Sequence, residues 1–167
     1  VRRLYPLRKG RKTKDFPSGA VLDGTMGEDA QGRADFNGYG VFTWPAGDAY
    51  MGDWAGGRRE GVGVYRSAAG AEYAGEWRDG RRHGWGCLFH ANGEEYEGEF
   101  KEGQCHGVGR LASANGDSYQ GQFRRGRFHG MGRFRKCNGD TYVGHCADGR
   151  AEGVGVLALA SGEKYKG

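Results

Sequence analysis

The chain has 167 residues, of which 37% are hydrophobic, 28% are charged and 35 are glycine. Its formal net charge is +4, but residues 1–20 carry seven Lys or Arg against one Asp, so the rest of the chain is slightly acidic. A nucleic-acid-binding repeat protein should show a continuous basic stripe, and the longest apolar stretch, Val154 to Ala160, is far shorter than the roughly 20 residues of a membrane span. We therefore expect neither a nucleic-acid partner nor a transmembrane helix.

The chain opens with a basic segment, residues 1–15, which we expect to be solvated. In residues 16–49, Phe16-Pro17-Ser18-Gly19 is typical of a turn, and Leu22 to Met26 resemble a first strand. Extra residues lie in the stretch from Gly27 to Asn37. We interpret 16–49 as one degenerate unit with an insertion.

Residues 50–164 are dominated by a tyrosine that recurs every 23 residues, together with five glycines at fixed offsets from it. A period of this length indicates a repeat array. Each unit is too small to bury its own apolar face and must stack on its neighbours. The sequence thus predicts five regular repeats, and residues 165–167 begin another, so we expect the chain to be part of a longer protein. The tyrosines are Tyr50, Tyr73, Tyr96, Tyr119, Tyr142 and Tyr165.

Each unit, numbered from its tyrosine as position 1, contains two alternating segments that predict two strands. A three-residue loop at positions 19–21, ending in a left-handed glycine, sets Leu88 opposite Tyr96 and keeps the apolar residues on one face. The same register places Gly86 opposite Gly98 and Gly84 opposite Phe100. Within a unit, a four-residue loop over positions 7–10 places Trp77 opposite Gly84.

The predicted fold is all-β: an elongated, single-layer, twisted antiparallel sheet of successive hairpins. Each large ring at position 5 is expected to lie between two glycines, an arrangement in which an aromatic side chain covers bare strand backbone. The rows of glycine are expected to leave a trough of uncovered backbone on the same face.

The segment Tyr73-Ala-Gly75-Glu-Trp77-Arg-Asp-Gly80-Arg-Arg-His-Gly84-Trp-Gly86 carries a resemblance to a known family. It resembles the MORN (membrane occupation and recognition nexus) repeat, and the pattern recurs from Tyr50, Tyr96 and Tyr119. The unit at Tyr142 departs from it, with Cys146 where an aromatic residue is usual, and so does the first unit. The resemblance covers roughly residues 16–167.

The resemblance implies an elongated sheet of hairpins with no catalytic activity or cofactor of its own. MORN proteins are commonly scaffolds in cilia, flagella and membrane-linked cytoskeleton, which implies a cytoplasmic, cytoskeleton-associated protein. Some are regulatory arms on enzymes, and that alternative stays open for the longer protein. The family is also associated with protein–protein contact and dimerisation.

The first hypothesis for function is a protein-interaction scaffold that holds a partner helix, an extended segment or a second copy of the chain along the aromatic trough. A single-layer sheet has no second layer to cover this face, and exposed apolar patches of several hundred Å² usually mark interaction sites. The predicted contact residues are the rings Tyr73, Trp77, Tyr96, Phe100, Tyr119 and Phe123, with Arg78, Lys101 and Arg124 as a polar rim.

A second candidate seam lies at position 13, which is apolar in every unit and points to the opposite face. Ordinary strand propensity explains such residues as well as a dimer or partner interface does. The residues are Val62, Trp85, Val108, Met131 and Val154.

The alternative hypothesis is a peripheral membrane module that meets anionic phospholipid through basic residues, because each basic group near such a surface contributes about 1 kcal/mol. The predicted contacts, with the basic segment 1–15, are Arg124, Arg125, Arg127, Arg133, Arg135 and Lys136. The acidic stretch from Leu22 to Ala49 weighs against a uniformly lipid-facing body.

Metal binding and catalysis are not indicated. His83, His106 and His129 recur at position 11, but adjacent copies should stand about 9.6 Å apart across two strands, too far to share one ion. The Gly-x-Gly pairs lack the third glycine and the helix of a phosphate loop. The four cysteines are expected to be free thiols, as in a reducing compartment.

Overall fold

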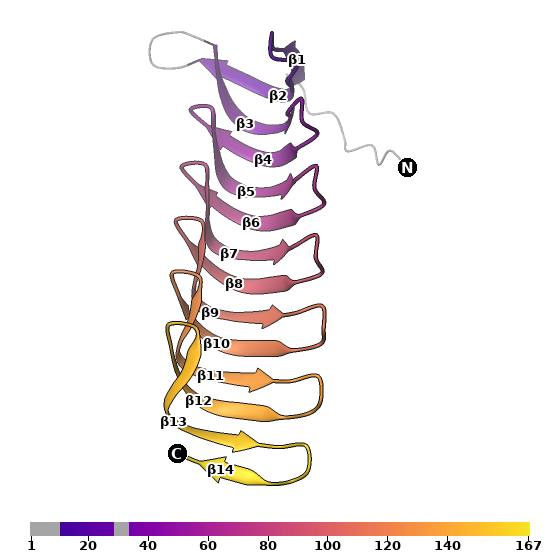
Figure 1. The fold of residues 1–167 in the computed structure, drawn as a ribbon. Helices are drawn as coiled ribbons and strands as arrows, with labels where there is room; N and C mark the ends of the chain where they lie inside the picture. The colour runs from indigo at the N-terminus through magenta and orange to yellow at the C-terminus, as the bar shows by residue number, and fades with distance from the viewer. Residues whose placement is uncertain (1–10, 29–33) are drawn as a thin grey trace.

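The structure, a computed structural model, describes residues 11–28 and 34–167. These residues form one open sheet of 14 strands in which every strand pairs antiparallel with its neighbour in the sequence (Figure 1). The predicted all-β sheet of successive hairpins is therefore confirmed. No helix that could cross a bilayer occurs in this part of the chain.

The strands follow one another from the N-terminal to the C-terminal end of the stack. They are β1 (Arg11–Asp15), β2 (Val21–Glu28), β3 (Ala34–Thr43), β4 (Ala49–Ala55), β5 (Arg58–Arg66), β6 (Glu72–Arg78), β7 (Arg81–Phe89), β8 (Glu95–Lys101), β9 (Gln104–Ala112), β10 (Ser118–Arg124), β11 (Arg127–Arg135), β12 (Thr141–Ala147), β13 (Arg150–Ala158) and β14 (Lys164–Lys166).

Successive units are joined by the predicted three-residue turn. Between β7 and β8, His90 N donates to Glu94 O at 2.8 Å, and the turn ends at Gly93, whose φ of 84° is left-handed. Leu88 consequently pairs with Tyr96, and Gly84 with Phe100, as the register argument predicts. This register keeps the tyrosine, position 5 and position 16 on one face of the sheet.

Within a unit the predicted four-residue loop is wrong. The strands are joined by a two-residue turn, Asp79-Gly80 between β6 and β7, in which both residues have positive φ (49° and 75°), as in the type I′ hairpin that Asp-Gly favours. A bulge between Gly75 and Trp77 absorbs the difference, so Trp77 pairs with Arg82 rather than with Gly84.

The bulge has a specific side-chain partner at position 4. The carboxylate of Glu76 accepts a hydrogen bond from Trp85 N at 2.9 Å, and a Cβ added at Gly84 would lie 2.3 Å from Glu76 Oε2. Gly84 has a φ of 54°, a left-handed conformation that favours glycine. Position 12 is therefore glycine because of the bulge, and not to receive the ring of Trp77.

The first unit keeps the plan with different residues. Residues 11–15, interpreted from the sequence as part of a solvated segment, instead form β1, which pairs with β2. Leu22 takes the place of the tyrosine, and the ring of Phe36 covers the glycine pair Gly24 and Gly40. Residues 1–10 and the part of the insertion at 29–33 lie outside the described residues.

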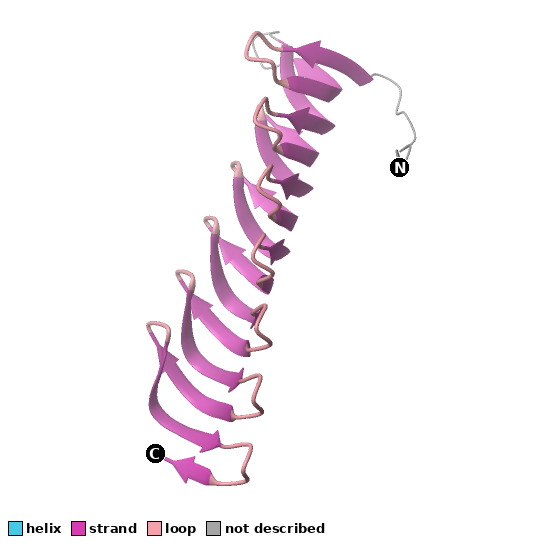
Figure 2. Cartoon of the chain, turned by 45° about the vertical axis from the view of Figure 1, so that its right-hand side comes forward, coloured by secondary structure: helices cyan, strands magenta, loops and turns pink. Residues whose placement is uncertain are grey.

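The two faces of the sheet differ sharply. The strands are bowed along their length (Figure 2). The buried rings of the core lie together on one side of the sheet. We call this side, with positions 1, 5, 10 and 16, the aromatic face. We call the other side, with positions 2, 4, 13 and 15, the outer face. The tyrosines of β4, β6, β8 and β10 are at most 1% exposed, whereas Val62 on the outer face is 63% exposed.

Candidate partner-binding face

The aromatic face is built on a continuous ladder of rings. Tyr73 stands edge-to-face between Trp77 of its own unit and Phe100 of the next, with both ring centroids 5.0 Å away. Tyr96 stands in the same way between Phe100 and Phe123, at 5.0 and 4.9 Å. Edge-to-face pairs at this distance contribute about 0.5–1.5 kcal/mol each beyond the apolar area that they bury. The ladder thus couples each unit to the next.

The tyrosines, and not the position-5 rings, cover the glycine rows. A Cβ at Gly86 would lie 2.5 Å from Tyr73 Oη, which donates to Glu76 O at 2.9 Å. The sequence prediction of an aromatic ring over bare glycine backbone is right in kind but names the wrong ring. The predicted trough of uncovered backbone is also wrong, because the tyrosines fill it.

Burial of these phenols has an electrostatic consequence. It raises the pKa of four position-1 tyrosines above the ordinary value, because the charged phenolate loses its water. The four are Tyr50, Tyr73, Tyr96 and Tyr119. The hydroxyl groups are therefore neutral hydrogen-bond donors to the bulge carbonyls.

The six rings predicted as partner contacts lie in the core of the sheet. Tyr73, Trp77, Tyr96, Phe100, Tyr119 and Phe123 are between 1% and 5% exposed. The side chains that lie above them on the aromatic face are those at positions 10, 16 and 18. Those positions, with the ring edges, form the surface that another molecule could touch.

Position 10 carries the residues that the sequence reasoning missed. Arg59 lies 4.2 Å from the centroid of the Trp77 ring, and its Nη2 donates to Gly80 O at 2.7 Å. Arg82 repeats this contact one unit on, 5.4 Å from the Phe100 ring and 2.8 Å from Gly103 O. Burial lowers the pKa of Arg59. The signal available in the sequence was an arginine at the same offset in two successive units.

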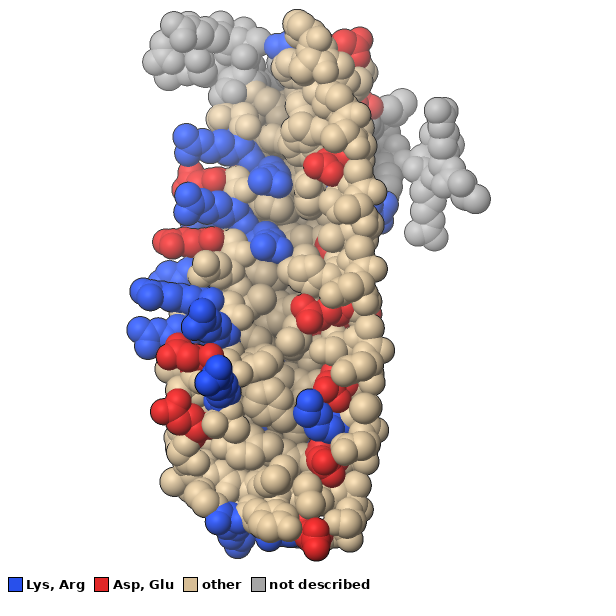
Figure 3. Space-filling view, viewed as in Figure 1, with Lys and Arg blue, Asp and Glu red and all other residues tan. Residues whose placement is uncertain are grey.

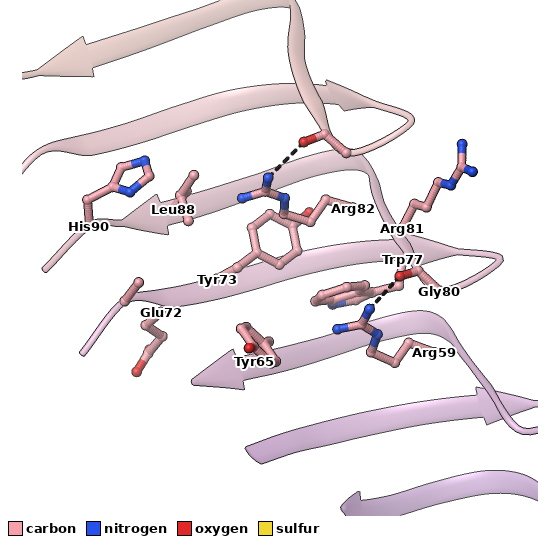
Figure 4. Close-up of a pocket in the computed structure, with 12 residues that line it drawn as sticks. Arg59, Tyr65, Glu72, Tyr73, Trp77, Gly80, Arg81, Arg82, Leu88 and His90 are labelled. Atoms are coloured by element: carbon pink, nitrogen blue, oxygen red, sulfur yellow. Dashed lines mark hydrogen bonds between the residues drawn. The ribbon is translucent and has the colours of Figure 1, made fainter. Parts of the chain in front are cut away.

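The two arginines line a hollow of about 400 Å³ on the aromatic face (Figure 4). In Figure 4, Tyr73 lies between the two guanidinium groups, and Leu88 and Tyr65 lie on the floor. Its far rim carries His90. The hollow is mainly apolar with two cations above the floor, which suits a side chain with an apolar body and an anionic end.

The same place in the fourth unit is filled differently. Position 10 there is Phe128, whose ring lies 4.1 Å from Tyr119 and 4.9 Å from Phe134. Cys105 occupies position 10 of the third unit, and burial raises the pKa of its thiol to about 11. Along the stack, position 10 therefore changes from cationic to apolar.

The two edges of the sheet differ in charge. Positions 6–10 of the five regular units hold ten Lys or Arg against three Asp or Glu, whereas positions 17–23 hold four against six. Figure 3 shows Lys and Arg gathered on the side with the two-residue turns. The predicted rim residues Arg78, Lys101 and Arg124 all belong to this edge, which we call the cationic edge. The small net charge of the repeats conceals it.

The six residues predicted to meet lipid do not form one patch. Arg124, Arg125 and Arg127 line a hollow at the cationic edge. Lys136 lies at the opposite edge, where it pairs with Asp117 at 2.9 Å. Arg133 lies on the outer face, and Arg135 follows it near the edge of Lys136. The set is thus divided between two edges and a face.

The position-13 residues form an exposed row on the outer face. Val62, Trp85, Val108, Met131 and Val154 are between 49% and 73% exposed. Their neighbours across the strands are polar: Trp85 pairs with Glu99, and Met131 with His145. The row is narrow and bordered by charge, in contrast to the continuous aromatic floor on the other side.

Among the described residues, no cluster of three or more His, Cys, Asp or Glu could hold a metal ion. Cys87, Cys105, Cys137 and Cys146 are free thiols, as the repeat positions predict. Cys146 takes position 5 of the fifth unit and is buried there, where it ends the ladder of rings.

Comparison with known families settles the nature of the repeat. A sequence model of the MORN repeat matches residues 33–49, 50–72, 73–95, 96–118 and 119–141, well over half of the chain. The chain belongs to the MORN repeat family. The four complete matched MORN units, from residue 50 to residue 141, carry the tyrosine, the position-5 ring and the glycines from which the aromatic face is built.

Two solved structures are similar to this MORN protein. One is the TCP domain of SAS-4 (dCPAP) of Drosophila melanogaster, in complex with a proline-rich motif of Ana2 (dSTIL). It has a TM-score of 0.55 and 16% identity, over 99% of this chain and 97% of the other. The G-box domain of the microcephaly protein CPAP has a TM-score of 0.45 and 11% identity, over 95% and 98%. No match was found among curated protein sequences.

Proposed function

We propose that this MORN protein is a non-enzymatic scaffold whose aromatic face holds an extended segment of a protein partner, laid along the stack of hairpins. The observation that carries the proposal is the hollow lined by Arg59, Arg82 and Leu88 above an unbroken floor of rings. Grooves lined by aromatic side chains are the usual receptors for extended, proline-containing segments.

The choice of an extended segment over a helix or a second copy rests on shape. The floor is a strip one strand-length wide, bordered on both sides by turns, and it continues from unit to unit (Figure 2). A single extended chain matches such a strip. The SAS-4 TCP domain, which has the same fold, was solved with a proline-rich motif of a partner, and that precedent supports the choice.

The proposed setting is a ciliary or membrane-associated cytoskeletal assembly in the cytoplasm, as family resemblance implies. The proposal gives the membrane no direct role, since the basic residues expected to meet lipid are divided between two edges and a face. A homodimer through the outer face is the competing arrangement that the binding experiment must separate from the proposal.

The test is a selection of linear peptides from a random library against the intact chain, followed by affinity measurements with two matched variants. Arg82→Phe fills the hollow with the ring that Phe128 provides in the fourth unit. Val108→Phe adds the same ring to the outer face, where Val108 is exposed. Both variants are first checked for an unchanged circular dichroism spectrum.

We expect the selected peptides to lose at least about tenfold in affinity for Arg82→Phe, equivalent to about 1.4 kcal/mol, and to bind Val108→Phe as they bind the parent. The reverse pattern would move the site to the outer face. A selection that enriches no peptide sensitive to Arg82→Phe would refute the proposed function.

A further inference from the structure

Resting on that proposed function, we propose that the bound segment is acidic and adopts the polyproline II conformation, with a carboxylate at every third residue held by Arg59 and Arg82. This assigns to the two arginines a role in reading the partner, and it names the partner's chemistry. Three features support this role: the hydrogen bonding of the two guanidinium groups, the spacing of the units and the charge of the cationic edge.

The two guanidinium groups have no anionic partner in the part of the chain that the structure describes. Each lies half-buried against the rings and donates through Nη2 to the carbonyl oxygen of a turn glycine, Gly80 or Gly103. Among residues 13–24 and 36–167, whose side chains the structure describes, no carboxylate forms an ion pair with either arginine, whereas the neighbouring Arg58 pairs with Asp79. A guanidinium carries five N–H donors, so most of the donor capacity of Arg59 and Arg82 is available above the hollow.

A carboxylate is the acceptor that fits this arrangement. Guanidinium and carboxylate form bidentate, charge-assisted hydrogen bonds, and a planar guanidinium held against aromatic rings is already oriented for them. The hydrogen bond from Nη2 to the turn glycine fixes the plane of each group. Most of the ordering cost of these long side chains has therefore been met before the partner binds.

The spacing of the units selects one backbone conformation. Equivalent atoms in successive units are separated by two strands, about 9.6 Å. A polyproline II segment repeats the same side-chain direction every three residues, or about 9.3 Å. A strand repeats its side-chain direction about every 6.6 Å, and two helical turns advance about 10.5 Å over seven residues. Only the polyproline II segment presents one equivalent side chain to each unit.

Position 10 then predicts the order of side chains along the segment. Two cationic units, with Arg59 and Arg82, precede the unit with the neutral Cys105 and the unit with the Phe128 ring. The bound segment should place two acidic residues and then two apolar ones, each three residues from the last. Such a pattern also fixes the register of the segment on the repeats, which otherwise present nearly identical floors.

The cationic edge also favours an acidic partner, and its charges act over a longer range than the contacts of Arg59 and Arg82. Its ten Lys or Arg against three Asp or Glu run beside the hollow for the length of the regular units. Charges of this kind steer an oppositely charged partner and raise its association rate, whereas close pairs at the centre of the interface decide affinity. An acidic peptide segment satisfies both, and its apolar residues use the aromatic floor.

The experiment uses the intact chain and three labelled synthetic peptides, with binding followed by fluorescence anisotropy. The first peptide repeats Glu-Pro-Pro. The second has the same composition with its glutamates grouped at one end, and the third has Gln in place of Glu. The protein variants are Arg59→Gln with Arg82→Gln, which leaves the hollow open, and Arg58→Gln with Arg150→Gln, which makes the same change of charge at exposed places on the same edge.

We expect the Glu-Pro-Pro peptide to bind about tenfold more tightly than either control peptide. It should lose about tenfold in affinity for Arg59→Gln with Arg82→Gln, because the neutral amide of glutamine cannot form the charge-assisted, bidentate hydrogen bonds to the glutamates. Arg58→Gln with Arg150→Gln should change the affinity less than about threefold and act mainly on the association rate.

Equal binding of the spaced and grouped glutamate peptides, or equal losses in the two double variants, would overturn the inference. If the glutamine peptide binds as tightly as the glutamate peptide, and Arg82→Phe still weakens the binding of both, Arg59 and Arg82 do not recognise carboxylates. The proposed function then stands without this inference. If none of the three peptides binds while the library selection still enriches peptides that lose affinity for Arg82→Phe, the inference is wrong and the proposed function stands. A short single-stranded RNA or phosphatidylserine vesicles that bind through Arg59 and Arg82 in place of the acidic peptide would likewise overturn the inference.

Discussion

The packing of tyrosine on glycine backbone predicts that Gly109→Ala destabilises the sheet although alanine is the better strand residue. A Cβ at Gly109 would lie 2.5 Å from Tyr96 Oη and 2.7 Å from two ring carbons. The ring cannot retreat freely, because Oη donates to Glu99 O at 2.9 Å and the ring is held between Phe100 and Phe123.

The magnitude follows from the contacts that must yield. Overpacking a filled site costs about 1–3 kcal/mol, and displacing the phenol weakens a hydrogen bond that contributes about 1 kcal/mol. Replacing a strand glycine by alanine returns about 0.5–1 kcal/mol. We therefore expect a net loss of about 1–3 kcal/mol. Tyr96→Ala alone should cost about 3–5 kcal/mol, the range for large aromatic truncations.

The decisive quantity is the coupling between the two sites, measured by urea unfolding of the parent, both single variants and the double variant. With the ring removed, Gly109→Ala should stabilise the sheet by about 0.5–1 kcal/mol, so the double variant should be about 2–4 kcal/mol more stable than additivity predicts. Val108→Ala, the exposed neighbour on the outer face, should change the stability by less than about 0.5 kcal/mol. Additive effects, or a stabilising Gly109→Ala in the parent, would refute the packing argument.

Three further predictions concern titration. Burial raises the pKa of Tyr50, Tyr73, Tyr96 and Tyr119 in the folded state, so the unfolded chain loses its phenolic protons first and the free energy of unfolding should fall as the pH rises above about 10. Absorbance near 295 nm should show these tyrosines ionising only as the sheet unfolds, and ionisation before unfolding would contradict their burial. Burial raises the pKa of Cys105 to about 11, so Cys105 should react with iodoacetamide far more slowly at pH 8 than the exposed Cys137. Equal reaction rates of the two thiols in a mass-spectrometric time course would show that Cys105 is open to solvent. The hydrogen bond from Lys136 lowers the pKa of Asp117 to about 2, so the contribution of Asp117 to stability should be lost as the pH falls below 3.8. An NMR titration should give a higher pKa for Asp117 in Lys136→Met. An unchanged pKa would show that the ion pair between Asp117 and Lys136 does not form in solution.

The repeat period alone was enough to predict the number of strands per unit and the register between units. Requiring Leu88, Tyr96 and Phe100 on one face leaves only the odd loop, and the structure has that loop. The interior of the unit could not be predicted in the same way. A four-residue loop and a two-residue turn with a bulge both keep Tyr73 opposite Leu88, and the choice depends on Asp79-Gly80 and on the carboxylate of Glu76.

The candidate site was predicted less well than the fold, for a related reason. The bulge shifts the last part of β6 against β7 and brings Arg82 opposite Trp77 on the aromatic face. The predicted four-residue loop placed position 10 in a turn, so Arg59 and Arg82 could not be recognised as part of the site. The rings named from the sequence lie on the predicted face, but they are buried in its core. The Tyr73 ring, for example, packs flat against the backbone of Gly86 and does not project from the sheet.

The most direct measurement of the central claim is methyl NMR of the intact chain during titration with the Glu-Pro-Pro peptide or a library-selected peptide. Leu88 and Leu111 report on the aromatic face, and Val62, Val108 and Met131 report on the outer face. The account predicts saturable shifts of Leu88 and Leu111, with the outer-face methyl groups unmoved. Shifts confined to Val62, Val108 and Met131 would contradict it.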